Sequence, residues 1–192
     1  MEISENEIDI IIKSEDNCHI IERAEIPDIE LYMDQVTTFM ETKLFGYKRD
    51  MKDKIMTKTM INNYAKAKLF PAPYKKKYTR NHIMLLVIIY HLKNMLSIND
   101  IARLLLPVNE ELEHNPNTHL VERIYDNFTE MQKKAIEVIK NDEQYGHAFF
   151  SNEFQVTGRN AETIQKILYV LGLSIFTSLE KRISEKIIDS GL

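Results

Sequence analysis

The chain has 192 residues, 44% hydrophobic and 28% charged, which is typical of a globular protein and excludes global disorder. Its longest apolar run, 83–90, falls far short of the roughly 20 residues that a membrane-spanning helix needs. The lone cysteine, Cys18, excludes an intramolecular disulfide, and no histidine pair has the spacing of a zinc site. The acidic N-terminus is unlike a secretory signal. We therefore expect a cytoplasmic, mainly helical protein that does not enter the membrane, has no cofactor or metal, and is not an enzyme.

The net charge of −4 is distributed very unevenly along the chain. Residues 46–99 contain twelve lysines and arginines against only Asp50 and Asp53. This window therefore carries +10 and leaves −14 for the rest of the chain. No acidic residue occurs between 58 and 99. A basic segment on an acidic body indicates where a polyanion would bind.

The first elements in chain order are an N-terminal arm and a helix. Residues 1–28 are acidic and contain a β-branched run at 8–12, which predicts either an edge strand or a partly ordered arm over the core. Asp28 can cap a helix over 29–43, and Gly46 marks its end. The charged residues that follow predict a connecting loop.

A second, short helix is expected to begin at Thr57 or Thr59 and to end near Phe70, before Pro71. Its apolar residues gather on one side at helical spacing, and the opposite side is polar without a carboxylate. The inward residues are Ile61, Tyr64, Ala65 and Leu69, and the outward residues are Thr59, Asn62, Asn63 and Lys66.

The basic, proline-bounded segment 71–82 predicts a hairpin wing between two helices. Thr79 can cap the next helix, 82–95, which is apolar enough to be the central buried helix. Ser97 can cap a short helix with Asp100 in the capping-box position, and Pro107 is expected to stop it.

Residues 107–192 are expected to form a C-terminal helical region. An acidic loop precedes an amphipathic helix over 118–140, an aromatic linker follows, and a long helix begins at about 161. The apolar stripe at 164–187 fits either core packing or a homodimer interface, and we favour the homodimer. Phe149, Phe150 and Phe154 could line an effector pocket or form a satellite core, so a small-molecule effector stays open.

The stretch 57–105 resembles the MerR-type winged helix–turn–helix. The similar parts are the apolar pair before Pro71, the basic Lys77–Tyr78 of the wing, and a long helix followed by a short one at 97–101. More closely, the segments LYMDQVTTFM, TKTMINNYAK, KKYTRNH and LSINDI are similar to the DUF1836 family of Firmicutes. The resemblance covers about 27–106 and implies an all-α fold with a small β wing and a role in regulation. One departure is Asn62–Asn63, where MerR proteins have an arginine–tyrosine pair.

Ten residues are candidate contacts to DNA. Lysine and arginine neutralise phosphates, and asparagine can pair bidentately with adenine in the major groove. Asn62 and Asn63 could equally be exposed amides, and Tyr78, like Tyr64, is expected to pack rather than to stack on bases. The candidates are Lys58, Thr59, Asn62, Asn63, Lys66, Lys75, Lys76, Lys77, Tyr78 and Arg80.

The sequence thus predicts three parts: an arm (1–28), a MerR-like DNA-binding domain (29–106) and a C-terminal helical region (107–192). The predicted function is sequence-specific binding of duplex DNA by a transcriptional regulator acting as a homodimer. The alternative is a helical protein–protein adaptor whose basic face docks an acidic partner. The sequence does not indicate the operator or the sign of regulation.

Overall fold

A computed structural model describes residues 19–141, 176–177, 180–181 and 183–189. The chain divides into two compact units, one of residues 17–133 with 187–192, the other of 1–16 with 134–186. The described part is mostly helical, as expected, and none of its helices is long and apolar enough to cross a membrane. The elements, in order, are η2 (Arg23–Glu25), β1 (Leu31–Tyr32), α2 (Met33–Lys43), η3 (Phe45–Tyr47), α3 (Lys58–Lys66), β2 (Lys77–Tyr78), α4 (Arg80–Leu92), α5 (Ile98–His114) and α6 (Leu120–Asn141).

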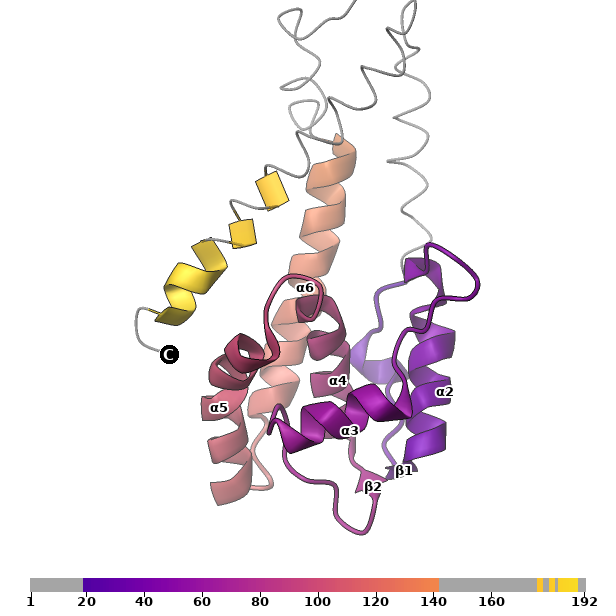
Figure 1. Ribbon diagram of the computed structural model, residues 1–192, viewed down its shortest axis with the longest axis vertical. Helices are drawn as coiled ribbons and strands as arrows, with labels where there is room; N and C mark the ends of the chain where they lie inside the picture. The colour runs from indigo at the N-terminus through magenta and orange to yellow at the C-terminus, as the bar shows by residue number, and fades with distance from the viewer. Residues whose placement is uncertain (1–18, 142–175, 178–179, 182, 190–192) are drawn as a thin grey trace, which may run out of the picture. The chain divides into compact units, whose positions relative to one another are not determined.

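Helix α4 forms the centre of the first unit. All of its residues from 82 to 90 are buried, so the prediction of a central apolar helix is confirmed. Figure 1 shows α2 and α5 on either side of it and α3 crossing in front. The helix begins after Thr79, whose backbone N–H donates to the His82 ring in a capping box. The expected end at residue 95 was three residues too late.

A two-stranded antiparallel sheet connects the start of α2 to the segment before α4. Leu31 pairs with Tyr78 and Tyr32 with Lys77. The expected hairpin wing is therefore only partly present, because β2 pairs mainly with β1 and meets Tyr74 only in an isolated bridge. The helix expected over 29–43 begins at Met33, since the two residues before it are extended in the sheet.

The prediction that Pro107 ends helix α5 was wrong. The helix passes through Pro107 and reaches His114, so residues 108–114 are helical rather than a loop. A proline in a helix removes one backbone donor, but the apolar periodicity continues beyond it. Val108 and Leu112 are buried on the same side as Leu105, and this packing maintains the helix.

Helix α6 packs on the segment that precedes β1. Val121 and Tyr125 are fully buried, and the Tyr125 hydroxyl donates to the Ile21 carbonyl at 2.8 Å. Met131 of α6 is 62% exposed, although it lies at helical spacing from the apolar residues of the amphipathic helix expected over 118–140. The end of the predicted arm, 19–28, belongs to the core through Ile21 and Ile26. The run 8–12, the aromatic linker and most of the stripe at 164–187 lie outside the described residues.

Candidate nucleic-acid interface

Helix α3 presents a polar face that contains no carboxylate. Thr57 caps it, because its hydroxyl accepts a hydrogen bond from the Met60 N–H at 3.1 Å. Ile61 and Tyr64 are buried on the inner side. The four residues expected on the outer side are exposed: Thr59, Asn62, Asn63 and Lys66.

The C-terminal end of α3 is fixed by its backbone and by α5. Lys68 has a left-handed φ of 58°, and the Leu69 N–H donates to the Tyr64 carbonyl at 3.0 Å, which closes the last turn. The Asn109 side chain of α5 donates to the Lys68 carbonyl at 2.9 Å. The next two residues, Leu69 and Phe70, are buried, so the chain enters the following loop from a fixed position.

Two lysines form the tip of the turn that leads into β2. The Lys77 N–H donates to the Tyr74 carbonyl at 2.9 Å, and both central residues have positive φ, 48° at Lys75 and 63° at Lys76. Two positive φ values identify the turn as type I′, which favours Asn-Gly because other residues are strained there. Both lysines are exposed, and the Lys75 ammonium lies 5.1 Å from the Tyr74 ring centroid.

Buried aromatic groups support this turn from behind. Tyr78 is only 3% exposed and lies against the Phe70 and His82 rings, at centroid distances of 6.4 and 5.8 Å. His82 Nδ1 accepts from the Thr79 N–H at 3.0 Å, and its Nε2 donates to the Pro71 carbonyl at 2.9 Å. Burial lowers the pKa of His82, which keeps the ring neutral in this role. Tyr78 is therefore a packing residue, in agreement with the expectation that it packs rather than stacks on bases.

Arg80 links the start of α4 to the segment before β1. Its guanidinium donates to the Arg23 carbonyl at 2.6 Å and lies 3.8 Å from the Asp28 carboxylate. Its side chain is 25% exposed, the least of the basic candidates that form ion pairs on this side. Among the ten candidates, Tyr78 is buried, Lys77 and Arg80 are partly exposed, and the other seven are exposed.

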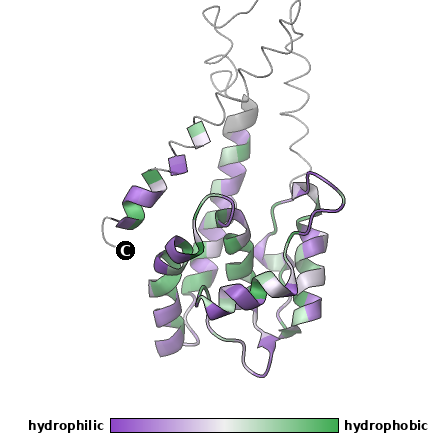
Figure 2. Cartoon of the chain, viewed as in Figure 1, coloured by the Kyte–Doolittle hydropathy of each residue, from purple (hydrophilic) through white to green (hydrophobic). Residues whose placement is uncertain are grey.

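The basic residues of this surface differ in whether carboxylates neutralise them. Lys58 pairs with Asp34, and Lys77 pairs with Glu30 at 3.0 Å. Within the described part of the chain, no carboxylate comes within ion-pairing distance of four other lysines, namely Lys66, Lys68, Lys75 and Lys76. Figure 2 shows the strongly hydrophilic β2 at the end of the loop below α3.

Sequence reasoning missed the carboxylates at 28, 30 and 34, because they precede their basic partners by 24 to 52 positions. No spacing rule connects residues so far apart.

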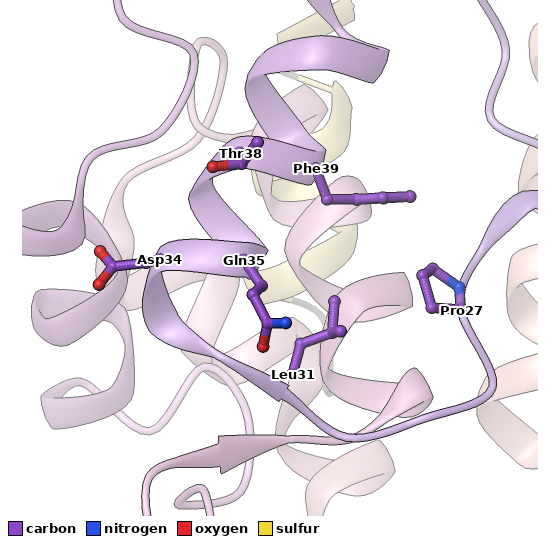
Figure 3. A pocket seen from close by; sticks show the side chains of 6 residues that line it. All are labelled: Pro27, Leu31, Asp34, Gln35, Thr38 and Phe39. Carbon is purple, nitrogen blue, oxygen red and sulfur yellow. The ribbon is translucent and has the colours of Figure 1, made fainter.

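The described residues offer little for small-molecule or metal chemistry. An open depression of about 410 Å³ lies beside α2, and Figure 3 shows the Asp34 carboxylate pointing away from Pro27 and Phe39. No group of three or more histidine, cysteine or acidic side chains in the described ranges could hold a metal ion. The depression is lined by Pro27, Leu31, Asp34, Gln35, Thr38 and Phe39.

Comparison with known proteins gives one match. No curated protein and no solved structure matches the chain. Residues 21–128, more than half of the chain, match the family described as domain of unknown function (DUF1836). This range begins in the segment that packs under α6 and extends beyond the predicted 29–106 domain to include all of α5. The chain therefore belongs to the DUF1836 family.

Proposed function

We propose that this domain binds duplex DNA sequence-specifically and acts in the cytoplasm as a transcriptional regulator. In this proposal α2 and α3 are a MerR-like helix–turn–helix, α3 enters the major groove, and the turn 74–77 is the wing. The observation that carries the proposal is the pair of exposed lysines, Lys75 and Lys76, at left-handed positions of a turn adjoining a carboxylate-free helix face.

The strain at the turn supports a role for its charge. A non-glycine residue in the left-handed region costs roughly 1 kcal/mol or more. Lys75 and Lys76 are both exposed, so burial does not offset this strain. Their ammonium groups can neutralise phosphates, and phosphate neutralisation supplies most of the non-specific affinity of DNA-binding proteins. The two lysines therefore place positive charge at positions where Asn-Gly would be less strained.

Helix α3 is suited to reading bases because its exposed side chains are amides, a hydroxyl and ammonium groups. The major groove admits an α-helix, and an asparagine can contact two atoms of an adenine edge. We assign base contacts to Asn62 and Asn63, and phosphate contacts to Thr59 and Lys66, which flank them. Lys58, Lys77 and Arg80 would extend the phosphate contacts, and the buried Tyr78 would hold the wing in position.

A homodimer is part of the proposal. MerR-like proteins pair through helices that follow the wing, and a two-fold protein reads two half-sites about one helical turn apart. The stripe 164–187 remains our candidate for the dimer interface, although only its last residues are among those described.

The test is fluorescence anisotropy of the full chain with a labelled mixed-sequence 30-mer duplex over a range of salt concentrations. We compare the wild type with the double variant Lys75→Asn/Lys76→Gly, which removes two charges while relaxing the turn. Loss of two phosphate contacts should reduce the slope of log K against log salt by about 1.8 and weaken binding at least tenfold at low salt. The control is Lys52→Asn/Lys134→Asn, which removes two exposed lysines outside the ten candidate residues and outside the stripe 164–187.

Weaker DNA binding by the turn variant could not be attributed to unfolding, because this variant should be at least as stable as the wild type. If the wild type does not bind the duplex even at low salt, the DNA proposal is rejected. The basic face would then be tested as a docking surface of an adaptor for an acidic protein. If binding is found, selection of a site from random duplexes should show a preference that Asn62→Ala/Asn63→Ala changes without altering the salt slope.

A further inference from the structure

Three carboxylates on the segment 28–34 face basic residues of the proposed DNA surface. Glu30 lies 3.0 Å from the Lys77 ammonium, and Asp34 pairs with the Lys58 ammonium. The third, Asp28, lies 3.8 Å from Arg80. The antiparallel pairing of β1 with β2 runs the two segments side by side, which brings Glu30 against β2 and Asp28 against the start of α4. Asp34, in the first turn of α2, reaches the start of α3.

These ion pairs are on the surface and contribute little to folding. Asp34 and Lys58 are 76% and 60% exposed, and Glu30 and Lys77 are 46% and 39% exposed. Exposed pairs of this kind are weak because water and salt screen them. The contact with the Glu30 carboxylate nevertheless raises the pKa of Lys77, because it stabilises the charged ammonium. Each pair can therefore open without disturbing the core.

We propose that Asp28, Glu30 and Asp34 act as a built-in competitor for DNA phosphates, which limits the affinity of the domain for duplex DNA. This inference rests on the proposed function of the same surface. A carboxylate oxygen and a phosphate oxygen accept the same hydrogen bonds from an ammonium or guanidinium group. DNA must therefore displace the carboxylates from Lys58, Lys77 and Arg80 before these groups can bind phosphate.

The competitor divides the basic residues into two sets. Lys66, Lys75 and Lys76 are available to the first phosphates that arrive, because no described carboxylate is paired with them. Lys58, Lys77 and Arg80 become available only when their acidic partners withdraw. The displaced carboxylates also repel nearby phosphates, so each one weakens binding twice, first by occupying a cation and then by its own charge.

The test neutralises the competitor without removing a single cation. The triple variant Asp28→Asn/Glu30→Gln/Asp34→Asn should bind the mixed-sequence duplex more tightly than the wild type. Neutralising the acidic partner of one exposed pair should tighten DNA binding about 1.4- to 5-fold. The three substitutions together should therefore tighten it roughly tenfold. Its salt slope should become steeper by about 2 to 3, as expected for up to three further phosphates. The matched control, Glu110→Gln/Glu113→Gln/Glu137→Gln, changes the net charge equally at exposed sites on α5 and α6.

A double-mutant cycle separates competition from long-range repulsion. Asp34→Asn should tighten binding in the wild type and should tighten it clearly less in a Lys58→Gln background, where only its repulsion of phosphates is relieved. An equal gain in both backgrounds, or an equal gain from the control triple variant, would overturn the proposal. Urea unfolding checks that each variant is folded, because Asp34 also lies in the positively polarised first turn of α2.

The two proposals fail in different ways. Absence of duplex binding by both the wild type and the triple variant rejects the proposed function. Binding by the wild type with no change in the triple variant rejects only the competitor.

Discussion

The side-chain amide of Asn109 in α5 donates a 2.9 Å hydrogen bond to the backbone carbonyl of Lys68, the left-handed residue that follows α3. Asn109 is 6% exposed and lies two positions beyond Pro107. The contact is possible only because α5 continues through that proline. The position of the proposed recognition helix thus depends on residues of α5 beyond Pro107, where the sequence predicts that the helix has already ended.

We predict that Asn109→Ala destabilises the domain. The substitution leaves the part-buried Lys68 carbonyl without its donor, which should lower the free energy of unfolding by about 1 kcal/mol. Urea unfolding followed by circular dichroism measures this change. The control is Asn99→Ala on the exposed start of α5, where a change within about 0.5 kcal/mol is expected. Equal effects of the two substitutions would mean that the bond to Lys68 contributes nothing.

Replacement of Pro107 by alanine should stabilise the domain. The proline is exposed inside α5 and removes the backbone donor that would bond the Arg103 carbonyl. Alanine restores that donor and has the higher helix propensity, while the more flexible unfolded chain offsets part of the gain. We expect the free energy of unfolding to rise by about 2 kcal/mol in urea. A decrease would indicate that a bend at Pro107 is needed to bring Asn109 to Lys68.

The turn variant Lys75→Asn/Lys76→Gly should be more stable than the wild type. Asparagine and glycine accept positive φ readily, so relief of strain should add about 1–2 kcal/mol to the free energy of unfolding. For a chain of this size, that corresponds to a rise in Tm of about 2–8 °C. Lys75→Ala/Lys76→Ala removes the same charges without relaxing the backbone. If this control gains as much, charge repulsion rather than backbone strain explains the effect.

The elements with strong local signals could be predicted from the sequence. Thr57, Thr79 and Ser97 each precede a helix as expected, because capping depends on residues within one turn. The exposed face of α3 and the burial of α4 follow from apolar spacing alone. Seven of the ten candidate residues are exposed, and all seven belong to α3 or to the adjoining turn.

The features that were not predicted depend on contacts between distant residues. The pairing of Leu31 with Tyr78 joins two strands of two residues, too short to produce a periodic pattern. The continuation of α5 depends on burial of Val108 and Leu112, which outweighs the usual effect of a proline. The burial of Tyr125 depends on Ile21, and local sequence does not connect residues 104 positions apart.

The last prediction concerns His91, which lies among aromatic rings. Its ring centroid is 5.1 Å from that of Tyr47 and 5.3 Å from that of Phe128. Burial lowers the pKa of His91 from 6.5 to about 4. Because the folded pKa is the lower one, its stabilising contribution is complete above pH 6.5 and is lost as the pH falls toward 4.

Between pH 7 and pH 5 the wild type should therefore lose about 2 kcal/mol of unfolding free energy through this residue. Urea unfolding at both pH values should show that His91→Phe removes this part of the loss, whereas the exposed His114→Gln retains it. His82 also has a pKa lowered by burial, so some pH dependence should persist in the variant. Glu25 affects stability only at lower pH. Partial burial raises the pKa of its carboxyl, but hydrogen bonds from Lys43, the Glu22 backbone and His19 outweigh burial and lower it to about 2, so its stabilising contribution is lost only below about pH 4.5. An unchanged pH 5 to 7 difference in His91→Phe would show that protonation of His91 does not limit stability.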